Sequence, residues 1–85
     1  MPVTVHPLAP GVVGNTGVVD GSLLVEAQIL KHATGAGISK WLDSLPADRR
    51  VVFPIVTNAL LVSLLRARGF ERAGDATWVR ERVEK

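Results

Sequence analysis

Apolar residues recur along this chain at spacings that change from one segment to the next, and two segments have the spacing of helices. Between Ile38 and Leu45 the apolar positions fall at steps of three and four, which predicts an amphipathic helix over residues 36–45. Pro46 should stop this helix, because proline cannot continue one. Residues 60–65 are apolar almost all round and predict a second, more buried helix.

The ends of the second helix carry residue types that helix ends favour. Thr57 or Asn58 can cap its first turn by accepting a main-chain N–H. Gly69 can take the left-handed conformation that closes many helices. Arg66 and Arg68 lie in the last turn, where cations complement the helix dipole.

Three segments after residue 21 predict strands. Ser22 to Leu30 is apolar and bounded by turns, so we expect a buried strand there, although its periodicity alone also fits a helix. Val51 to Val56 is rich in β-branched residues, but Pro54 within it cannot donate to a ladder. That strand is therefore expected at an edge or locally unpaired. Thr77 to Val79, after a turn at residues 74–75, predicts the last strand.

The first twenty residues predict further short strands. Val3 to Val5 fits an edge strand that His6-Pro7 would end. Val12 to Val19 fits a hairpin whose turn lies at residues 14–17, because glycine and asparagine there can take positive φ. Asp20-Gly21 predicts another turn.

These elements together predict a small α/β (α+β) fold, with a mostly antiparallel or mixed sheet of five to six strands and two helices. We expect one domain over residues 1–85. Residues 1–21 would form an N-terminal arm and hairpin, and residues 22–82 would form the core.

Composition changes this picture in two ways. The 85 residues are 47% hydrophobic, and a chain this short buries only a modest fraction of its surface, so we expect a second copy or another chain to cover part of it. All ten basic residues lie in residues 31–85, which suits an anionic ligand or a solvated basic face. The arginines are interleaved with acids and lack an aromatic stacking set, so nucleic acid is not the expected partner.

Other classes of chemistry are disfavoured by what the chain contains. There is no cysteine, which excludes disulfides and thiolate chemistry. His6 and His32 have no third ligand cluster beside them, so no metal site is expected. No apolar run approaches the roughly 20 residues of a membrane span, and no signal peptide is expected. The compartment stays open between the cytoplasm and a virion.

A glycine-rich turn precedes the first predicted helix. Main-chain N–H groups at a strand-to-helix turn form an anion-binding concavity, and the helix dipole adds partial positive charge. Gly35 and Gly37 suit such a turn, because a Cβ would keep phosphate oxygens away from the main chain. A P-loop is excluded, since no Lys followed by Ser or Thr closes the turn.

This turn and the segment after it resemble the C-terminal half of the GNAT family of N-acetyltransferases. In that family the turn has Gln or Arg, two variable residues, Gly, one variable residue, then Gly or Ala. Gly35 and Gly37 match it, with His32 in the first position. Farther along, the family often has Asn, a Leu-Tyr pair about six residues later, then Gly-Phe. The corresponding residues here are Asn58, Leu64-Leu65 and Gly69-Phe70, so the resemblance covers residues 22–80.

The resemblance implies a binding site for acetyl-CoA or CoA. The pyrophosphate would bind at Gly35, Ala36, Gly37 and Ile38. In the family two central strands splay apart so that the pantetheine arm lies between them, and Pro54 would suit such a splay. The cofactor-binding residues implied on the strand and second helix are Ala27, Ile29 and Asn58, of which Asn58 is also the expected helix cap.

The chain also departs from the family pattern. Leu65 occupies the position of the tyrosine that usually protonates the departing thiolate, and the chain contains no tyrosine. The two helices that normally precede the first hairpin and build the acceptor side are not found. Glu26, on the presumed fourth strand, is a candidate catalytic base, and His6 and His32 are the other candidates.

Two functions from different classes follow from these matches and departures. The first is a non-catalytic GNAT-like structural or assembly module, for example a small virion or complex component, that packs against copies of itself or other chains. The second is a reduced acyl-CoA-binding protein or N-acetyltransferase. The departures favour the first function, which is the one we expect, and the glycine turn favours ligand binding as in the second.

Overall fold

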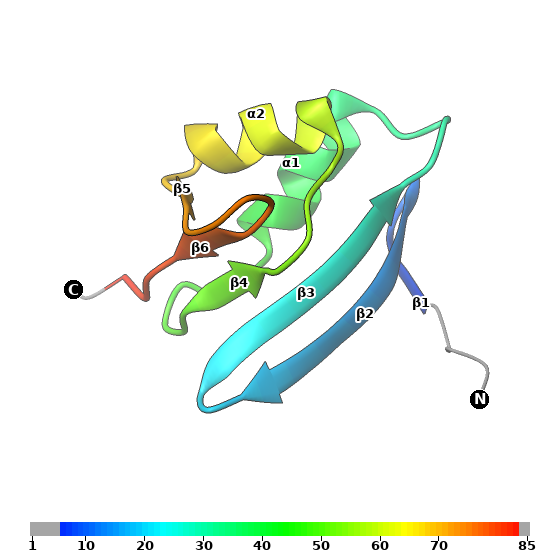
Figure 1. Cartoon of the computed structure of the whole chain (residues 1–85). Helices are drawn as coiled ribbons and strands as arrows, with labels where there is room; N and C mark the ends of the chain where they lie inside the picture. The colour runs from blue at the N-terminus through cyan, green and yellow to red at the C-terminus, as the bar shows by residue number, and fades with distance from the viewer. Residues whose placement is uncertain (1–5, 84–85) are drawn as a thin grey trace.

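The sheet has six strands in the order β1-β2-β3-β4-β6-β5 across residues 6–83, which the computed structural model describes (Figure 1). β3 and β4 are parallel, and the other neighbouring pairs are antiparallel. The strands are β1 (His6–Ala9), β2 (Val12–Val19), β3 (Ser22–Ile29), β4 (Val51–Phe53), β5 (Glu71–Arg72) and β6 (Trp78–Arg80), and the helices are α1 (Gly35–Asp43) and α2 (Ala59–Ala67). The predicted α+β fold with a mixed sheet and two helices is confirmed.

The hairpin predicted around residues 14–17 is wrong, because β2 continues without interruption through that segment. The chain instead reverses at Asp20-Gly21, where both residues have positive φ (52° and 78°), as a two-residue hairpin turn requires. Gly14 serves close packing rather than a turn. It pairs with Ala27 of β3, and a Cβ on it would lie 1.8 Å from the main-chain oxygen of Glu26.

The first strand also differs from the prediction. Val3 to Val5 lies outside the described residues. His6-Pro7 does not end a strand but begins β1, which pairs with β2. Pro7 is compatible with this place because β1 is an edge strand, where a missing donor breaks no ladder on its outer side.

Both predicted helices are present, with ends that their caps explain. Thr34 caps α1 and Asn58 caps α2, each accepting a main-chain N–H three residues on, at 3.0 Å. α1 ends at Asp43, two residues before the predicted end, because Ser44 turns back to bond the carbonyl of Trp41. α2 closes at Gly69 (φ 83°), where the N–H groups of residues 69 and 70 bond carbonyls of the last turn. Within residues 6–83, neither helix is long and apolar enough to cross a membrane.

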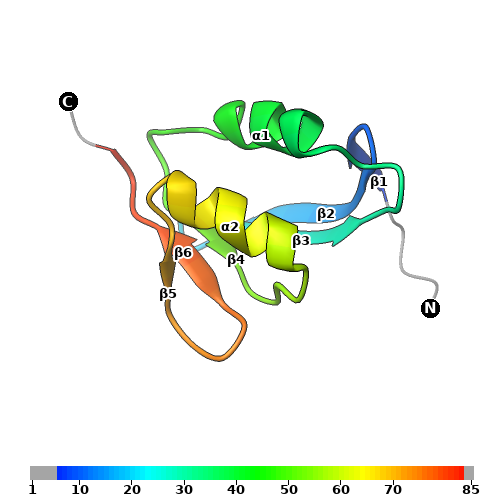
Figure 2. The same cartoon turned by 90° about the horizontal axis from the view of Figure 1, so that it is seen from above.

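The two helices lie side by side and run in the same direction on one face of the sheet (Figures 1 and 2). At their C-terminal ends Arg68, which directly follows α2, pairs with Asp43 of α1 at 2.9 Å and bonds Ser39. At their N-terminal ends a Cβ on Gly35 would lie 4.0 Å from Leu60 Cδ1. The first turns of α1 and α2 are therefore neighbours.

Aromatic rings join the helices to the sheet. Phe53 of β4 makes edge-to-face contacts with Trp41 of α1, centroids 5.9 Å apart, and with Phe70 after α2, centroids 5.4 Å apart. Trp78, which pairs with Phe53, lies under the guanidinium of Arg66. Residues from both helices thus contact the same face of β4 and β6.

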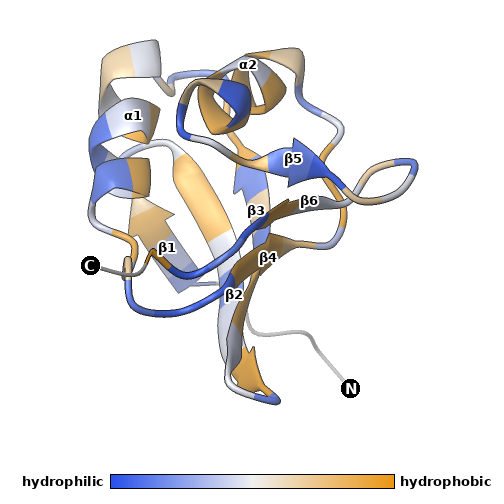
Figure 3. Ribbon diagram, turned by 90° about the vertical axis from the view of Figure 1, so that its left-hand side faces the viewer, coloured by the Kyte–Doolittle hydropathy of each residue, from blue (hydrophilic) through white to orange (hydrophobic). Residues whose placement is uncertain are grey.

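Among the described residues, 6–83, no helix lies over the opposite face of the sheet. Side chains alternate along strands, so Leu24 of β3, Val52 of β4 and Val79 of β6, which are paired in register, form a row across that face. All three are half-buried, and Val19 nearby is 51% exposed. Figure 3 shows β5, at the edge beyond this row, as hydrophilic and much of β4 as hydrophobic.

We expect Gly14→Ala to lower the free energy of unfolding by about 2–4 kcal/mol, because its Cβ would clash with the main chain of β3. Gly17→Ala in the same strand is the control, since nothing lies within 4 Å of its Cβ, and its effect should stay within about 0.5 kcal/mol. Urea titrations of both variants measure the difference. Equal midpoints for the two variants would contradict the close approach of β2 and β3 at Gly14.

Candidate functional site

β3 loses its neighbour β4 soon after the two strands meet. They pair only at Leu23 with Val51 and at Leu24 with Val52. β3 then continues to Ile29, whereas β4 ends at Phe53. Figure 1 shows the two strands moving apart toward their C-terminal ends. The strand predicted from Val51 to Val56 is thus only half as long as expected.

Local bonding explains why β4 ends where it does. Pro54 has no N–H to donate, so the ladder stops there. The chain after it bonds the loop before β6 instead: Val56 N–H donates to the carbonyl of Ala76 at 2.8 Å, and Thr77 Oγ1 donates to the carbonyl of Pro54 at 2.9 Å. These bonds draw the segment away from β3.

The departure of β4 leaves main-chain groups of β3 open along one edge. Leu23 N–H points to the β4 side, where it donates to the carbonyl of Arg50 at 2.8 Å. Main-chain groups of a strand alternate sides, so Ala27 and Ile29 turn their N–H and C=O the same way. No residue of β4 pairs with either. Leu30, one residue on, points the other way and bonds Gly11 of the β1–β2 turn.

A groove follows this open edge. It consists of two adjoining cavities of about 320 and 360 Å³ that share Ala27, Gln28 and Thr57. The first cavity, called the outer cavity here, is also lined by Gly14, Asn15, Glu26 and Ile55. The second, called the inner cavity, lies toward the start of α2 and is also lined by Ile29, Leu30, Asn58 and Leu61. Three residues named from the sequence, Ala27, Ile29 and Asn58, therefore line one groove.

α2 begins at the inner end of the groove, which its cap Asn58 lines, and α1 begins beside α2 rather than in the lining of the groove. α1 follows β3 and α2 follows β4, and parallel strands end at the same edge of a sheet, where α/β proteins commonly bind ligands. In the described part of the chain, the N–H groups of Gly35 and Ala36 in α1 and of Ala59 and Leu60 in α2 have no hydrogen-bond acceptor. The positive ends of two helix dipoles thus lie together.

The four residues predicted to bind pyrophosphate divide into two pairs. Gly35 and Ala36 have free N–H groups at the start of α1. Gly37 N–H donates to Thr34 Oγ1 at 3.0 Å, and Ile38 N–H donates to the Thr34 carbonyl, also at 3.0 Å. The Ile38 side chain is fully buried in the core. Thr34 therefore already occupies the N–H groups of Gly37 and Ile38. A sequence pattern alone does not reveal that these two donors are taken.

The candidate titratable residues lie apart from one another. Glu26 is exposed and lines the outer cavity, next to its cross-strand partner Asn15. His32 is exposed in the turn before α1, and His6 begins the edge strand β1. No cluster of three metal-ligating side chains occurs within residues 6–83.

Leu65 does not lie at the groove, contrary to what the resemblance implies for its position. Its side chain is 0% exposed and belongs to the core between α2 and the sheet. Leu61, one turn earlier on the same helix, lines the inner cavity instead. Sequence reasoning also missed Gln28, Leu30 and Thr57 in the groove; the only signal for them was Pro54, which marks where β4 ends.

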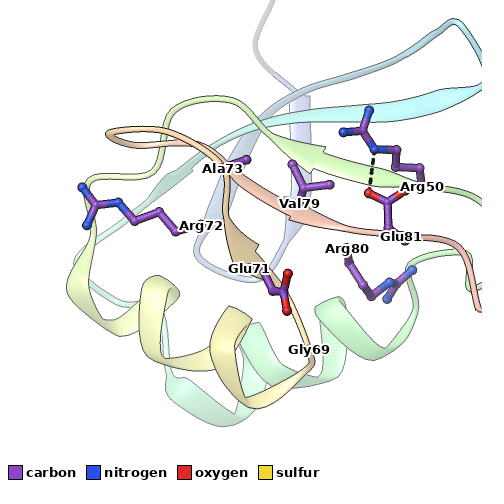
Figure 4. A pocket seen from close by; sticks show the side chains of 8 residues that line it. All are labelled: Arg50, Gly69, Glu71, Arg72, Ala73, Val79, Arg80 and Glu81. Carbon is purple, nitrogen blue, oxygen red and sulfur yellow. Dashed lines mark hydrogen bonds and ion pairs between the residues drawn. The ribbon is translucent and has the colours of Figure 1, made fainter.

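A separate cavity of about 410 Å³ lies against β5 and β6 (Figure 4). Each of its arginines has at least one partner: Arg50 pairs with Glu81 at 3.0 Å, Arg72 Nε donates to the carbonyl of Gly74 at 2.9 Å, and Arg80 donates to the carbonyl of Pro46 at 2.5 Å. Arg80 Nε is buried and has no hydrogen-bond partner among the described residues. These bonds use the charged groups to fix the loops around the sheet. The groove along β3 is therefore the better candidate site.

No family model, curated protein or solved structure matches this chain. The groove is accordingly interpreted from its own geometry.

We expect Leu65→Tyr to lower the free energy of unfolding by about 1–3 kcal/mol, because a larger side chain would be forced into a filled core. Ser63→Tyr on the exposed side of α2 is the control and should change stability by less than about 0.5 kcal/mol. Chemical denaturation of the two variants gives the comparison. A Leu65→Tyr protein as stable as the unmodified chain would mean that the position opens to the groove after all.

Proposed function

We propose that this chain binds CoA or an acyl-CoA in the groove along β3, in the manner of the C-terminal half of a GNAT N-acetyltransferase. The observation that carries the proposal is the open edge of β3 at Ala27 and Ile29. The strand order, with one parallel pair that separates, is compatible with this likeness.

The pantetheine arm of CoA suits the open edge because it is an extended chain with two amide groups. Each amide can exchange hydrogen bonds with the N–H and C=O of a strand, as a neighbouring strand would. Ala27 and Ile29 offer such groups two residues apart. Leu61 and Ile55 supply apolar walls for the methylene and methyl groups of the arm.

The pyrophosphate of CoA suits the inner end of the groove. Free N–H groups and helix dipoles favour negative charge, each dipole by roughly 0.3–1 kcal/mol at an exposed site. Gly35 lets a phosphate oxygen approach the main chain, since only Leu60 lies near the place of a Cβ. The sulfur would then lie in the outer cavity, near Glu26.

The chemistry available at the sulfur end supports binding rather than acyl transfer. The chain has no tyrosine, and Leu65 is buried away from the groove. Glu26 is the only ionisable side chain among the described residues that line the groove. A carboxylate can accept a proton from an amine, but no group beside it can protonate a departing thiolate. We therefore propose a CoA-binding module that lacks a general acid.

We expect isothermal calorimetry to detect CoA binding, and Gly35→Asp to weaken it by about tenfold or more, because a carboxylate would occupy the phosphate site. The variant should still fold, since aspartate is favourable in the first turn of a helix and only Leu60 Cδ1 lies near its Cβ.

Ser63→Asp adds the same charge on the exposed middle of α2 and is the matched control. It should bind CoA as the unmodified chain does. An unmodified chain that gives no heat with millimolar CoA would reject the proposed function.

A second candidate function, a structural or assembly module, is favoured by the open face of the sheet. The row of Leu24, Val52 and Val79 on that face has no covering element within residues 6–83. Contiguous apolar surface that solvent still reaches often marks a protein interface. A second copy of the chain, or another protein, would cover it, and this role is compatible with ligand binding at the edge of β3.

If the chain self-associates through this face, Leu24→Lys should convert the assembly to monomer, because a buried unpaired charge opposes association. Thr16→Lys, at an exposed position of β2 on the other face, should leave the assembly unchanged. Sedimentation velocity over a range of concentrations distinguishes the two. A stable monomer of the unmodified chain at all concentrations would exclude self-association.

A further inference from the structure

β3 continues as a strand beyond the point where β4 leaves it, so part of the sheet has an unpaired edge inside the groove. The register of β3 with β4 ends at Leu24. Ala27 and Ile29 turn their N–H and C=O groups to the vacated side, and no residue of β4 pairs with either. An unpaired strand edge of this kind is a template for another extended chain, which pairs with it through main-chain hydrogen bonds.

A strand added at this edge would meet a different surface on each face of the sheet, because its side chains alternate between the faces. On the helix face, Ala27 and Ile29 pack against the core, and Leu61 of α2 lines the same inner cavity. Every second residue of an added strand therefore faces apolar side chains.

The open face beside the same stretch of β3 is polar and carries an acid. Glu26 and Gln28 lie on this face, in the alternation that also places Leu24 there, and both side chains are exposed. Glu26 lines the outer cavity, and its carboxylate is in no ion pair in the described part of the chain. The intervening residues of an added strand would therefore lie beside an unpaired negative charge.

We propose that the open edge of β3 binds an extended segment of a partner protein, in which apolar residues alternate with basic ones. The segment adds to the sheet beside Ala27 and Ile29 and exchanges main-chain hydrogen bonds with them. Its apolar side chains pack against Leu61, and its basic side chains lie beside Glu26. The two open residues, with one position on either side, accommodate about five residues of the partner.

Peptide binding at this edge goes beyond the proposed function and does not depend on it. The two share the open edge, but a peptide needs neither the start of a helix nor a glycine turn. A peptide and the pantetheine arm would use the same main-chain groups of Ala27 and Ile29, so a bound partner and bound CoA exclude one another. Peptide binding is therefore measured first without CoA.

The probe is the pentapeptide Val-Arg-Val-Arg-Val, acetylated at its N-terminus and amidated at its C-terminus so that it offers no amine for acylation. We expect the unmodified chain to bind it in isothermal calorimetry about fivefold more tightly than the matching peptide with Glu in place of Arg. In NMR hydrogen exchange the peptide should protect the N–H groups of Ala27 and Ile29. The N–H of Gln28, which faces β2, should not change.

Two methylated peptides test whether the main chain carries the binding. Alternate N–H groups of an added strand point toward β3, so N-methylation of one set, the valines or the arginines, should weaken binding by about tenfold or more. N-methylation of the other set should change it by less than about twofold. The arginines are the sensitive set for a segment parallel to β3, and the valines for an antiparallel one.

Glu26→Lys should reverse the charge preference, so that the Glu peptide binds about fivefold more tightly than the Arg peptide. Glu71→Lys makes the same change of charge at an exposed position of β5 and is the matched control. It should keep the preference of the unmodified chain. Circular dichroism checks that both variants are folded, which we expect because both side chains are exposed.

Peptides that do not bind at millimolar concentration would reject the inference, whether the edge stays open or a second copy of the chain covers it. Binding that tolerates N-methylation of both sets would also reject it, since the ligand would not then be an added strand. Neither result bears on the CoA titration, which tests the proposed function separately.

Where CoA binds as well, a saturating concentration of it should weaken peptide binding by about tenfold or more. An unchanged peptide affinity would place the peptide away from the edge of β3 and overturn the inference. Peptide binding by a chain that gives no heat with CoA would reject the proposed function and support the inference.

Discussion

A strand that loses its neighbour has to satisfy its main-chain groups in another way, and β3 loses β4 after two residue pairs. Pro54 ends the ladder, and the bonds of Val56 and Thr77 hold the following segment toward β6. This one separation creates the groove and opens the edge of β3 at Ala27 and Ile29. It also leaves Ile55 and Leu61 as the apolar wall of the groove. Without it, β4 would fill the space along β3 that an extended ligand could occupy.

The parallel pairing of β3 and β4 has a second consequence, at the ends of the helices. Because each strand is followed by a helix and both strands end at one edge, α1 and α2 begin side by side. Arg68 fixes the other ends of the helices against Asp43, and Phe53 anchors both to the sheet through Trp41 and Phe70. This packing uses one face of the sheet only, which is why an apolar row is left on the other.

The differences between expectation and structure share a physical origin. Residues 14–17 have the composition of a turn, yet they continue β2, because eight consecutive pairs with β3 place the reversal at Asp20-Gly21. Val51 to Val56 has the composition of a strand, yet only half of it is one, because its second half bonds the loop before β6. In both segments local preference was overruled by a partner distant in the sequence.

The sequence by itself determined the elements whose signals are local. The helix period, the cap at Asn58 and the glycine at 69 act within a few residues, so the two helices could be located from the chain alone. The tertiary structure decided which groups meet. Only the register of β3 against β4 brings Ala27 and Asn58 to one groove, and only packing buries Leu65. Such contacts join residues far apart along the chain, and no local pattern encodes their distance.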